Sequence, residues 1–176
     1  MSKIPLVCRS LKILFRIFSV LIVVVTTYLI LFDTQAFSMH SSFLSTLHIQ
    51  HPDFSLPHRL GILAIEALPL TFTVLICLRL ACLFQAFEQG FLFELKNIAN
   101  IKRIGIYMIL SECIQLIYQP AISIGMTYQN DVGERIASLS IGAANLSNLV
   151  TAIIIFVAAW VMQEAYKLKC ESQLTI

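Results

Sequence analysis

Four long apolar segments constrain the fold of this chain more than any other feature of its sequence. They run over about residues 11–32, 60–87, 104–128 and 141–166. A membrane-spanning helix needs about 20 mostly apolar residues, because the hydrocarbon layer is about 30 Å thick and a helix rises about 1.5 Å per residue. All four segments are long enough. We therefore expect an all-α integral membrane four-helix bundle that forms a single transmembrane domain over residues 1–176.

The composition and charge of the chain agree with the lipid bilayer as its main partner. Hydrophobic residues make up 58% of the sequence and charged residues only 12%, whereas soluble proteins have about half and about a quarter. The formal net charge of +2 is too small to favour nucleic acid electrostatically, so no direct nucleic-acid partner is expected. The five cysteines show no C-x-x-C spacing, and we expect free thiols.

The distribution of lysine and arginine predicts the orientation of the chain in the membrane. Four lie in the N-terminal flank, up to Arg16, three in the connector between the second and third segments, and two in the C-terminal tail. The other two loops contain one each, Arg59 and Arg135. Because these residues resist translocation, both termini and the connector are predicted to be cytoplasmic. The first segment resembles a secretory leader, but its apolar run is longer than about 7–15 residues, and we expect it to remain as a membrane helix.

Three ionisable residues stand out well inside the predicted spans: Glu66 and Arg79 in the second, and Glu112 in the third. Such groups are costly in lipid and normally find polar partners or line a water-filled cavity. If the connector runs from Glu88 to Arg103, an antiparallel hairpin brings Arg79 and Glu112 to the same depth. We therefore predict that these two side chains form an ion pair.

Glu66 is expected at the level of the polar start of the fourth segment, which presents Asn145 and Asn148. Two interpretations stay open for this group. A carboxylate and amides can serve simply as hydrogen-bonding contacts between packed helices. They can also form a proton- or cation-linked site, since intramembrane carboxylates often mark ion pathways.

All four histidines, His40, His48, His51 and His58, lie in the first outer loop, residues 33–59. Imidazoles bind transition metals and titrate near pH 6.5, so metal binding and acid sensing are alternatives here. The spacing matches no metal-binding motif, however, and no metal or other cofactor is assigned. The loop is interpreted as an ordinary polar connection.

The connector is predicted to contain an amphipathic helix between the second and third spans. Phe91, Leu95, Ile98 and Ile101 recur at helical spacing, while basic residues fall on another face. Such a helix lies on the inner membrane surface with its basic side chains toward anionic headgroups. Alternatively, this surface serves as a docking site for a cytoplasmic protein.

Two short patterns on the cytoplasmic side resemble a known family. The connector pattern consists of Gly90, Phe93, Asn97, Lys102, Arg103 and Gly105. The tail pattern consists of Glu171, Leu174, Thr175 and Ile176. Together with the four-segment layout, they resemble the bacterial four-helix membrane proteins called domain of unknown function family 2975. Glu94 departs from that family, which usually has Ser or Thr there, and glutamate is a poor helix N-cap.

The resemblance implies a bacterial inner-membrane protein without established activity, so it gives no catalytic residues to carry over. Family members are often encoded beside a small helix-turn-helix regulator, which implies a cytoplasmic regulatory protein as partner. The chain also contains none of the common hydrolase, zinc-protease, phosphate-loop or dinucleotide-binding motifs, and we expect no enzyme.

Two functions are therefore predicted. The leading one is a membrane partner or signal input for that cytoplasmic regulator. The alternative is a small transporter or channel component that uses Glu66, Arg79 and Glu112. A chain of 176 residues would have to form a homo-oligomer to enclose such a pathway.

Overall fold

The computed structural model describes residues 4–40, 43–44, 47, 54–90, 94–131, 133–140 and 142–174. These ranges contain no β-strand, which confirms the all-α prediction. The helices are α1 (Ile4–Phe32), α2 (Thr34–His40), α3 (Leu56–Glu88), α4 (Leu95–Thr127) and α5 (Ala143–Leu174). All five cysteines are free, as expected.

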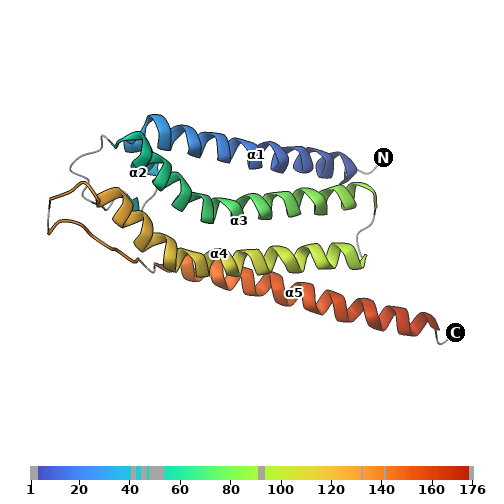
Figure 1. The fold of residues 1–176 in the computed structure, drawn as a ribbon. Coiled ribbons are helices and arrows are strands. Elements are labelled where there is room, and N and C mark those ends of the chain that lie inside the picture. Colours follow the sequence, from blue (N-terminus) through green and yellow to red (C-terminus); the bar gives the residue numbers. More distant parts are fainter. Residues whose placement is uncertain are drawn as a thin grey trace.

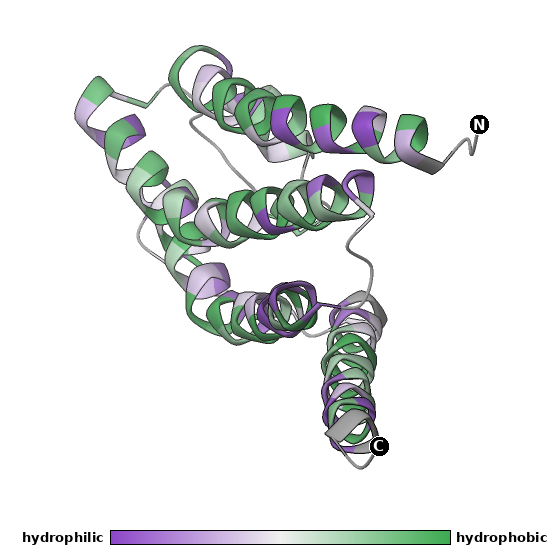
Figure 2. Cartoon of the chain, turned by 90° about the vertical axis from the view of Figure 1, so that its right-hand side faces the viewer, coloured by the Kyte–Doolittle hydropathy of each residue, from purple (hydrophilic) through white to green (hydrophobic). Residues whose placement is uncertain are grey.

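Within the described residues, three helices are long and apolar enough to cross a membrane. These spans are Pro5–Phe32, Leu56–Glu88 and Asn145–Glu171. Hydrophobic residues predominate along the long helices (Figure 2), and many large apolar side chains are exposed on them, as expected for surfaces that face lipid. The protein is therefore a multi-pass membrane protein. The third predicted span falls within α4, which is as long as α3 but more polar.

The four long helices of the described ranges form an open row, so the expected four-helix bundle is not confirmed. Helix α1 packs on α3, α3 on α4, and α4 on α5, whereas the other pairs of long helices have little or no contact. Figure 2 shows α5 set apart from α1 and α3, on the far side of α4. Helix α5 packs on α4 alone because residues 133–140, which precede it, lie along α4.

The two ends of the row differ (Figure 1). The N-terminus, the turn between α3 and α4 and the C-terminus all lie at one end, which we call the connector end. There, the Lys12 ammonium donates to the Glu88 carboxylate at 2.5 Å, and the Arg16 guanidinium donates to the Gln85 amide oxygen at 3.0 Å. These contacts join α1 to α3. The opposite end, with α2 and the other two connections, is the loop end.

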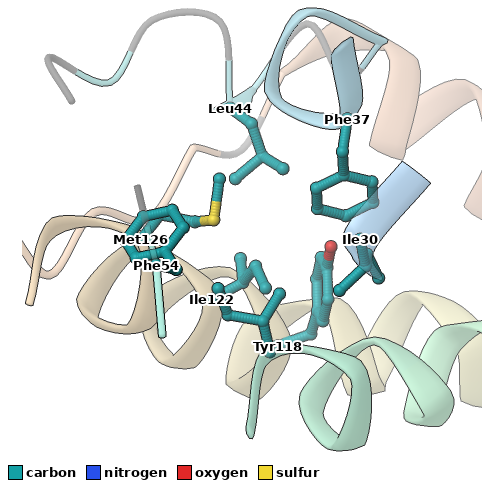
Figure 3. Packing of buried hydrophobic residues seen from close by; sticks show 8 residues of the cluster. Ile30, Phe37, Leu44, Phe54, Tyr118, Ile122 and Met126 are labelled. Carbon is teal, nitrogen blue, oxygen red and sulfur yellow. The ribbon is translucent and has the colours of Figure 1, made fainter. Parts of the chain in front are cut away.

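A hydrophobic cluster holds the loop end together (Figure 3). It joins α1, α2, α3 and α4 with the chain between α2 and α3. Its buried members are Ile30, Phe37, Leu44, Phe54, Ile62, Tyr118, Ile122 and Met126. Beside it, the Arg59 guanidinium donates to the backbone carbonyls of Phe54 and Leu31. Arg59, in α3, thus donates to a backbone carbonyl at the C-terminal end of α1 and joins the two helices there.

The expected separate helix in the connector is not observed. Helix α3 ends at Glu88, and Gly90 adopts a positive φ of 85°, a conformation that suits glycine after a helix. Helix α4 begins at Leu95, so residues 95–102 are its first two turns. Glu94 is the N-cap residue and makes no side-chain cap hydrogen bond, in line with its poor capping ability.

Helices α4 and α5 approach each other closely at Gly105. A Cβ atom there would lie 3.1 Å from the backbone nitrogen of Phe156 and 3.2 Å from its Cα. One turn earlier, the Lys102 ammonium lies 5.7 Å from the centre of the Phe156 ring. Two residues of the connector pattern therefore shape the contact between α4 and α5.

Candidate functional site

A polar cavity of about 310 Å³ lies between α1, α3 and α4, beneath α2 and the residues that follow it. We call it the Glu66 cavity. Its polar lining residues are Thr26, Glu66, Thr73, Gln115, Tyr118 and Gln119. Its apolar lining residues are Ile22, Phe37, Phe43, Pro69 and Leu70. At about 30 Å³ per molecule, this space holds about ten waters, enough for a small hydrated ligand.

Proline residues lie beside this cavity in both neighbouring helices. Pro69 in α3 and Pro120 in α4 have no backbone N–H to donate within the helix. Both helices bend in their outer parts (Figure 1). The Thr73 hydroxyl donates to the Pro69 carbonyl at 3.2 Å, and the Ser123 hydroxyl donates to the Pro120 carbonyl at 3.0 Å. The prolines thus help to separate α3 from α4 where the cavity opens between them.

Glu66 and Tyr118 form the polar centre of the cavity. The Tyr118 hydroxyl donates to the Glu66 carboxylate at 2.5 Å, a short hydrogen bond of the kind made by charged acceptors. Tyr118 is buried in the hydrophobic cluster, which fixes the position of its ring, and its hydroxyl points away from Ile122 (Figure 3). No Lys, Arg or His is among the described lining residues. The cavity therefore presents one carboxylate and several neutral oxygens.

The predicted contact of Glu66 with Asn145 and Asn148 is wrong. Helix α5 packs on α4 and not on α3, so its side chains do not reach the Glu66 cavity. Asn148 is exposed, and Asn145 lines a different pocket, between α4 and α5. Depth alone suggested this contact, whereas the order of the helices in the row excludes it.

The predicted ion pair between Arg79 and Glu112 is also absent. The ion pairs among the described residues are Lys12 with Glu88 and Lys167 with Glu164. Counted from the helix ends, Arg79 lies nine residues before Glu88, but Glu112 lies seventeen residues after Leu95. This difference of eight residues separates them by about 12 Å along the helix axes. The prediction failed because it assumed a connector that extended to Arg103.

An extended segment, residues 133–140, runs back along α4 from the loop end toward the middle of the row (Figure 1). We call it the strap. The Ile136 N–H donates to Thr127 Oγ1 at 3.1 Å, the Ser138 N–H to Ser123 Oγ at 2.9 Å, and the Ser140 N–H to Gln119 Oε1 at 2.7 Å. Figure 1 shows the strap leading directly into the start of α5.

The strap and the helix match because their repeats are nearly equal. Four residues of an α-helix advance about 6.0 Å, and two residues of an extended chain advance about 6.6 Å. Acceptors at every fourth residue of α4 therefore meet N–H groups at every second residue of the strap. All three acceptor residues are buried, and all of them are satisfied. This spacing of Gln119, Ser123 and Thr127 is visible in the sequence and could have indicated the contact.

Gln119 connects the strap to the cavity. Its amide oxygen accepts the Ser140 N–H, while the same side chain lines the Glu66 cavity. Gln115, one turn earlier, also lines the cavity. Helix α4 thus presents a polar stripe of Gln115, Gln119, Ser123 and Thr127. Gln115 and Gln119 line the cavity, and Gln119, Ser123 and Thr127 accept hydrogen bonds from the strap.

His58 packs against the hydrophobic cluster at the loop end and contacts α4. Its Nε2 lies 2.7 Å from the Gly125 carbonyl oxygen, and its ring stacks on Phe54 with the centres 4.7 Å apart. His40 is the last residue of α2, while His48 and His51 lie outside the described residues. Within the described ranges, no three His, Cys, Asp or Glu residues gather as metal ligands.

The remaining residues of the two patterns lie at the connector end. Asn97 is buried in the first turn of α4, and Arg103 is exposed on that helix. In α5, Glu171 is exposed and Leu174 is the last helical residue. Phe93, Thr175 and Ile176 lie outside the described residues. The structure thus does not bring the connector and tail patterns together into one described site.

Comparisons with known protein families, curated proteins and solved structures found no match for this chain. The resemblance of its connector and tail to a family therefore stays a prediction.

Proposed function

We propose that this chain is a bacterial inner-membrane protein that binds a small monovalent cation in the Glu66 cavity, as a transporter or channel component would. The observation that carries the proposal is a carboxylate in a polar cavity whose described lining contains no cationic side chain. A negative group that is partly shielded from solvent in this way attracts a cation more strongly than it would in water. We propose binding and translocation rather than catalysis.

The lining of the cavity favours a hard cation. Hydroxyl, amide and carboxylate oxygens are the ligands that such ions take in exchange for water. The cavity supplies these oxygens from Glu66, Tyr118, Gln115 and Gln119. One carboxylate neutralises one positive charge, which favours a monovalent over a divalent ion.

The proposed topology has four spans, with α4 as the third, and both termini in the cytoplasm. Helix α4 has 33 residues, as α3 does, and the two run antiparallel from the turn that joins them (Figure 1). The N-terminus, that turn and the C-terminus share one end of the row, and most of the lysines and arginines belong to the same segments. An even number of spans accounts for this arrangement.

Labelling of single introduced cysteines tests the topology. Gln89→Cys lies in the turn at the connector end, and Glu134→Cys lies on the strap, and both positions are exposed. In intact cells, a membrane-impermeant maleimide should modify Glu134→Cys and spare Gln89→Cys until the membrane is opened. Labelling of both positions in intact cells, or the opposite pattern, would overturn the topology.

Binding is tested with the purified protein in nanodiscs. Calorimetric titration with Na⁺, K⁺ and methylammonium should give saturable heat for at least one ion. Glu66→Gln should abolish the heat, and Tyr118→Phe should weaken binding by about tenfold, because a hydrogen bond to a charged group is lost. Glu134→Gln, an exposed carboxylate on the strap, is the matched control and should bind as the wild type does. Equal binding by Glu66→Gln would refute the proposal.

A second function is favoured by a polar pocket of about 330 Å³ at the connector end. It is lined by Cys82, Gln85, Ala86, Gln89, Glu94, Lys96, Asn97 and Asn100. We propose that this surface contacts a cytoplasmic regulatory protein, the partner that the family resemblance implies. Lys96→Glu and Arg103→Glu, both at exposed positions, should abolish recovery of a cytoplasmic protein in pull-downs from native membranes, and unchanged recovery would contradict the proposal.

A further inference from the structure

A second pocket, of about 200 Å³, lies on an adjoining face of α4, next to the Glu66 cavity. We call it the Glu112 pocket. Its walls come from three elements: α4, the strap and the first turns of α5. It is lined by Glu112, Cys113, Gln115, Leu116, Gln119, Leu139, Ser140, Asn145, Leu146 and Leu149. The strap builds this pocket, because it supplies Leu139 and Ser140 and positions the start of α5.

The Glu112 pocket combines one carboxylate with an apolar wall. Half of its lining residues are leucine or cysteine, and none of the described lining residues is cationic. Glu112 is half-buried, and its carboxylate makes no ion pair with any described residue. An anionic group beside apolar surface suits a ligand that is both positively charged and hydrophobic.

The two pockets differ in chemistry although they share Gln115 and Gln119 as a wall. The Glu66 cavity is lined by hydroxyls and amides, which replace the water around a small inorganic ion. The Glu112 pocket exposes mainly apolar surface, which cannot replace that water. A quaternary ammonium ion is weakly hydrated and carries its own apolar groups, so it loses little on entering such a pocket.

We propose that the Glu112 pocket binds an organic cation with apolar substituents, such as a quaternary ammonium compound. The carboxylate of Glu112 neutralises the charge, and the leucines of α4, the strap and α5 cover the apolar groups. This site is distinct from the Glu66 cavity, and the inference stands whether or not that cavity binds an inorganic ion.

Cys113 provides a direct readout, because its exposed thiol is part of the pocket wall. Purified protein in nanodiscs is treated with N-ethylmaleimide, with and without tetraethylammonium, and modification is followed by peptide mass spectrometry. Tetraethylammonium should slow the modification of Cys113 and leave that of Cys82 unchanged, because Cys82 is exposed on α3 at the connector end. Na⁺ at the same concentration should protect neither thiol.

Two variants test the assignment independently. Glu112→Gln should weaken protection of Cys113 by at least about tenfold in tetraethylammonium concentration, since the charge pair is lost. Leu149→Trp keeps the carboxylate but fills the pocket from α5, and it should also remove protection. Val150→Trp, at the exposed neighbouring position on α5, is the matched control and should behave as the wild type.

The outcomes separate this site from the proposed cation site. Protection that survives in both Glu112→Gln and Leu149→Trp would overturn the inference, as would a lack of protection in the wild type. Loss of protection in Glu66→Gln alone would also overturn it, because the ligand would then occupy the Glu66 cavity. Protection that is lost in Glu112→Gln and retained in Glu66→Gln would support it.

Discussion

Removal of a single hydroxyl from α4 should release the strap. In Ser123→Ala, the Ser138 N–H loses its acceptor, which lies 2.9 Å away in the wild type. A buried N–H left without a partner costs about 1–3 kcal/mol. Ser138 is half-buried, so water partly replaces the lost acceptor, and we expect the lower part of that range, about 1–2 kcal/mol.

This free energy is measurable as amide hydrogen exchange. Opening of the strap exposes the N–H groups of residues 133–140, and a change of about 1–2 kcal/mol raises their exchange about five- to thirtyfold. Mass spectrometry of peptides that cover the strap, with the protein in nanodiscs, gives this ratio. The helix itself should not weaken, because alanine has a higher helix propensity than serine.

Ser147→Ala is the matched control, because Ser147 is exposed on α5 and makes no described contact with the strap. Its exchange profile should equal that of the wild type. If Ser123→Ala leaves exchange of the strap unchanged, the strap is not held by the polar stripe. The proposal that the strap forms a stable wall of the Glu112 pocket would then be contradicted. If exchange rises equally over the whole chain, the hydroxyl stabilises the fold globally rather than the strap.

Two further predictions concern the contacts between helices. Gly105→Val should lower the thermal unfolding midpoint and separate α4 from α5, because its Cβ would lie 3.1 Å from the Phe156 backbone nitrogen, whereas Gly61→Ala, with open space around it, should be tolerated. A double-mutant cycle on Lys12 and Glu88 should give a coupling of about 1 kcal/mol, since both side chains are partly screened from water. An unchanged midpoint in Gly105→Val, or a coupling of zero in the cycle, would contradict these assignments.

The apolar segments predicted the long helices well, because length and composition alone determine which segments can cross a bilayer. The order of the helices was not predictable in the same way, since every long helix has an apolar surface and none specifies its neighbour. The connector was misjudged because the pattern from Leu95 to Ile101 is equally periodic in a surface helix and in the first turns of a longer one. That error of register produced the false pair of Arg79 and Glu112.

With the observed ends of α3 and α4, equal depth along the two helices predicts Tyr118 as the partner of Glu66. Glu66 lies 22 residues before Glu88, and Tyr118 lies 23 residues after Leu95, so the two side chains are at almost the same height. The error lay in the assumed start of the third span, which was placed after Arg103 although α4 begins at Leu95. Tyr118 was missed because the partners of Glu66 were sought in the fourth span, although a phenolic hydroxyl is a strong donor to a carboxylate.

The polarity of α4 follows from its place in the row. It packs between α3 and α5, and the strap covers part of its surface, so more of its residues are buried than in α3. Polar side chains inside a membrane are tolerated where they face protein or a cavity, and the stripe from Gln115 to Thr127 does so. We infer that the polar residues that lower the hydropathy of α4 mark it as the central span, the one helix that contributes to both proposed cation sites.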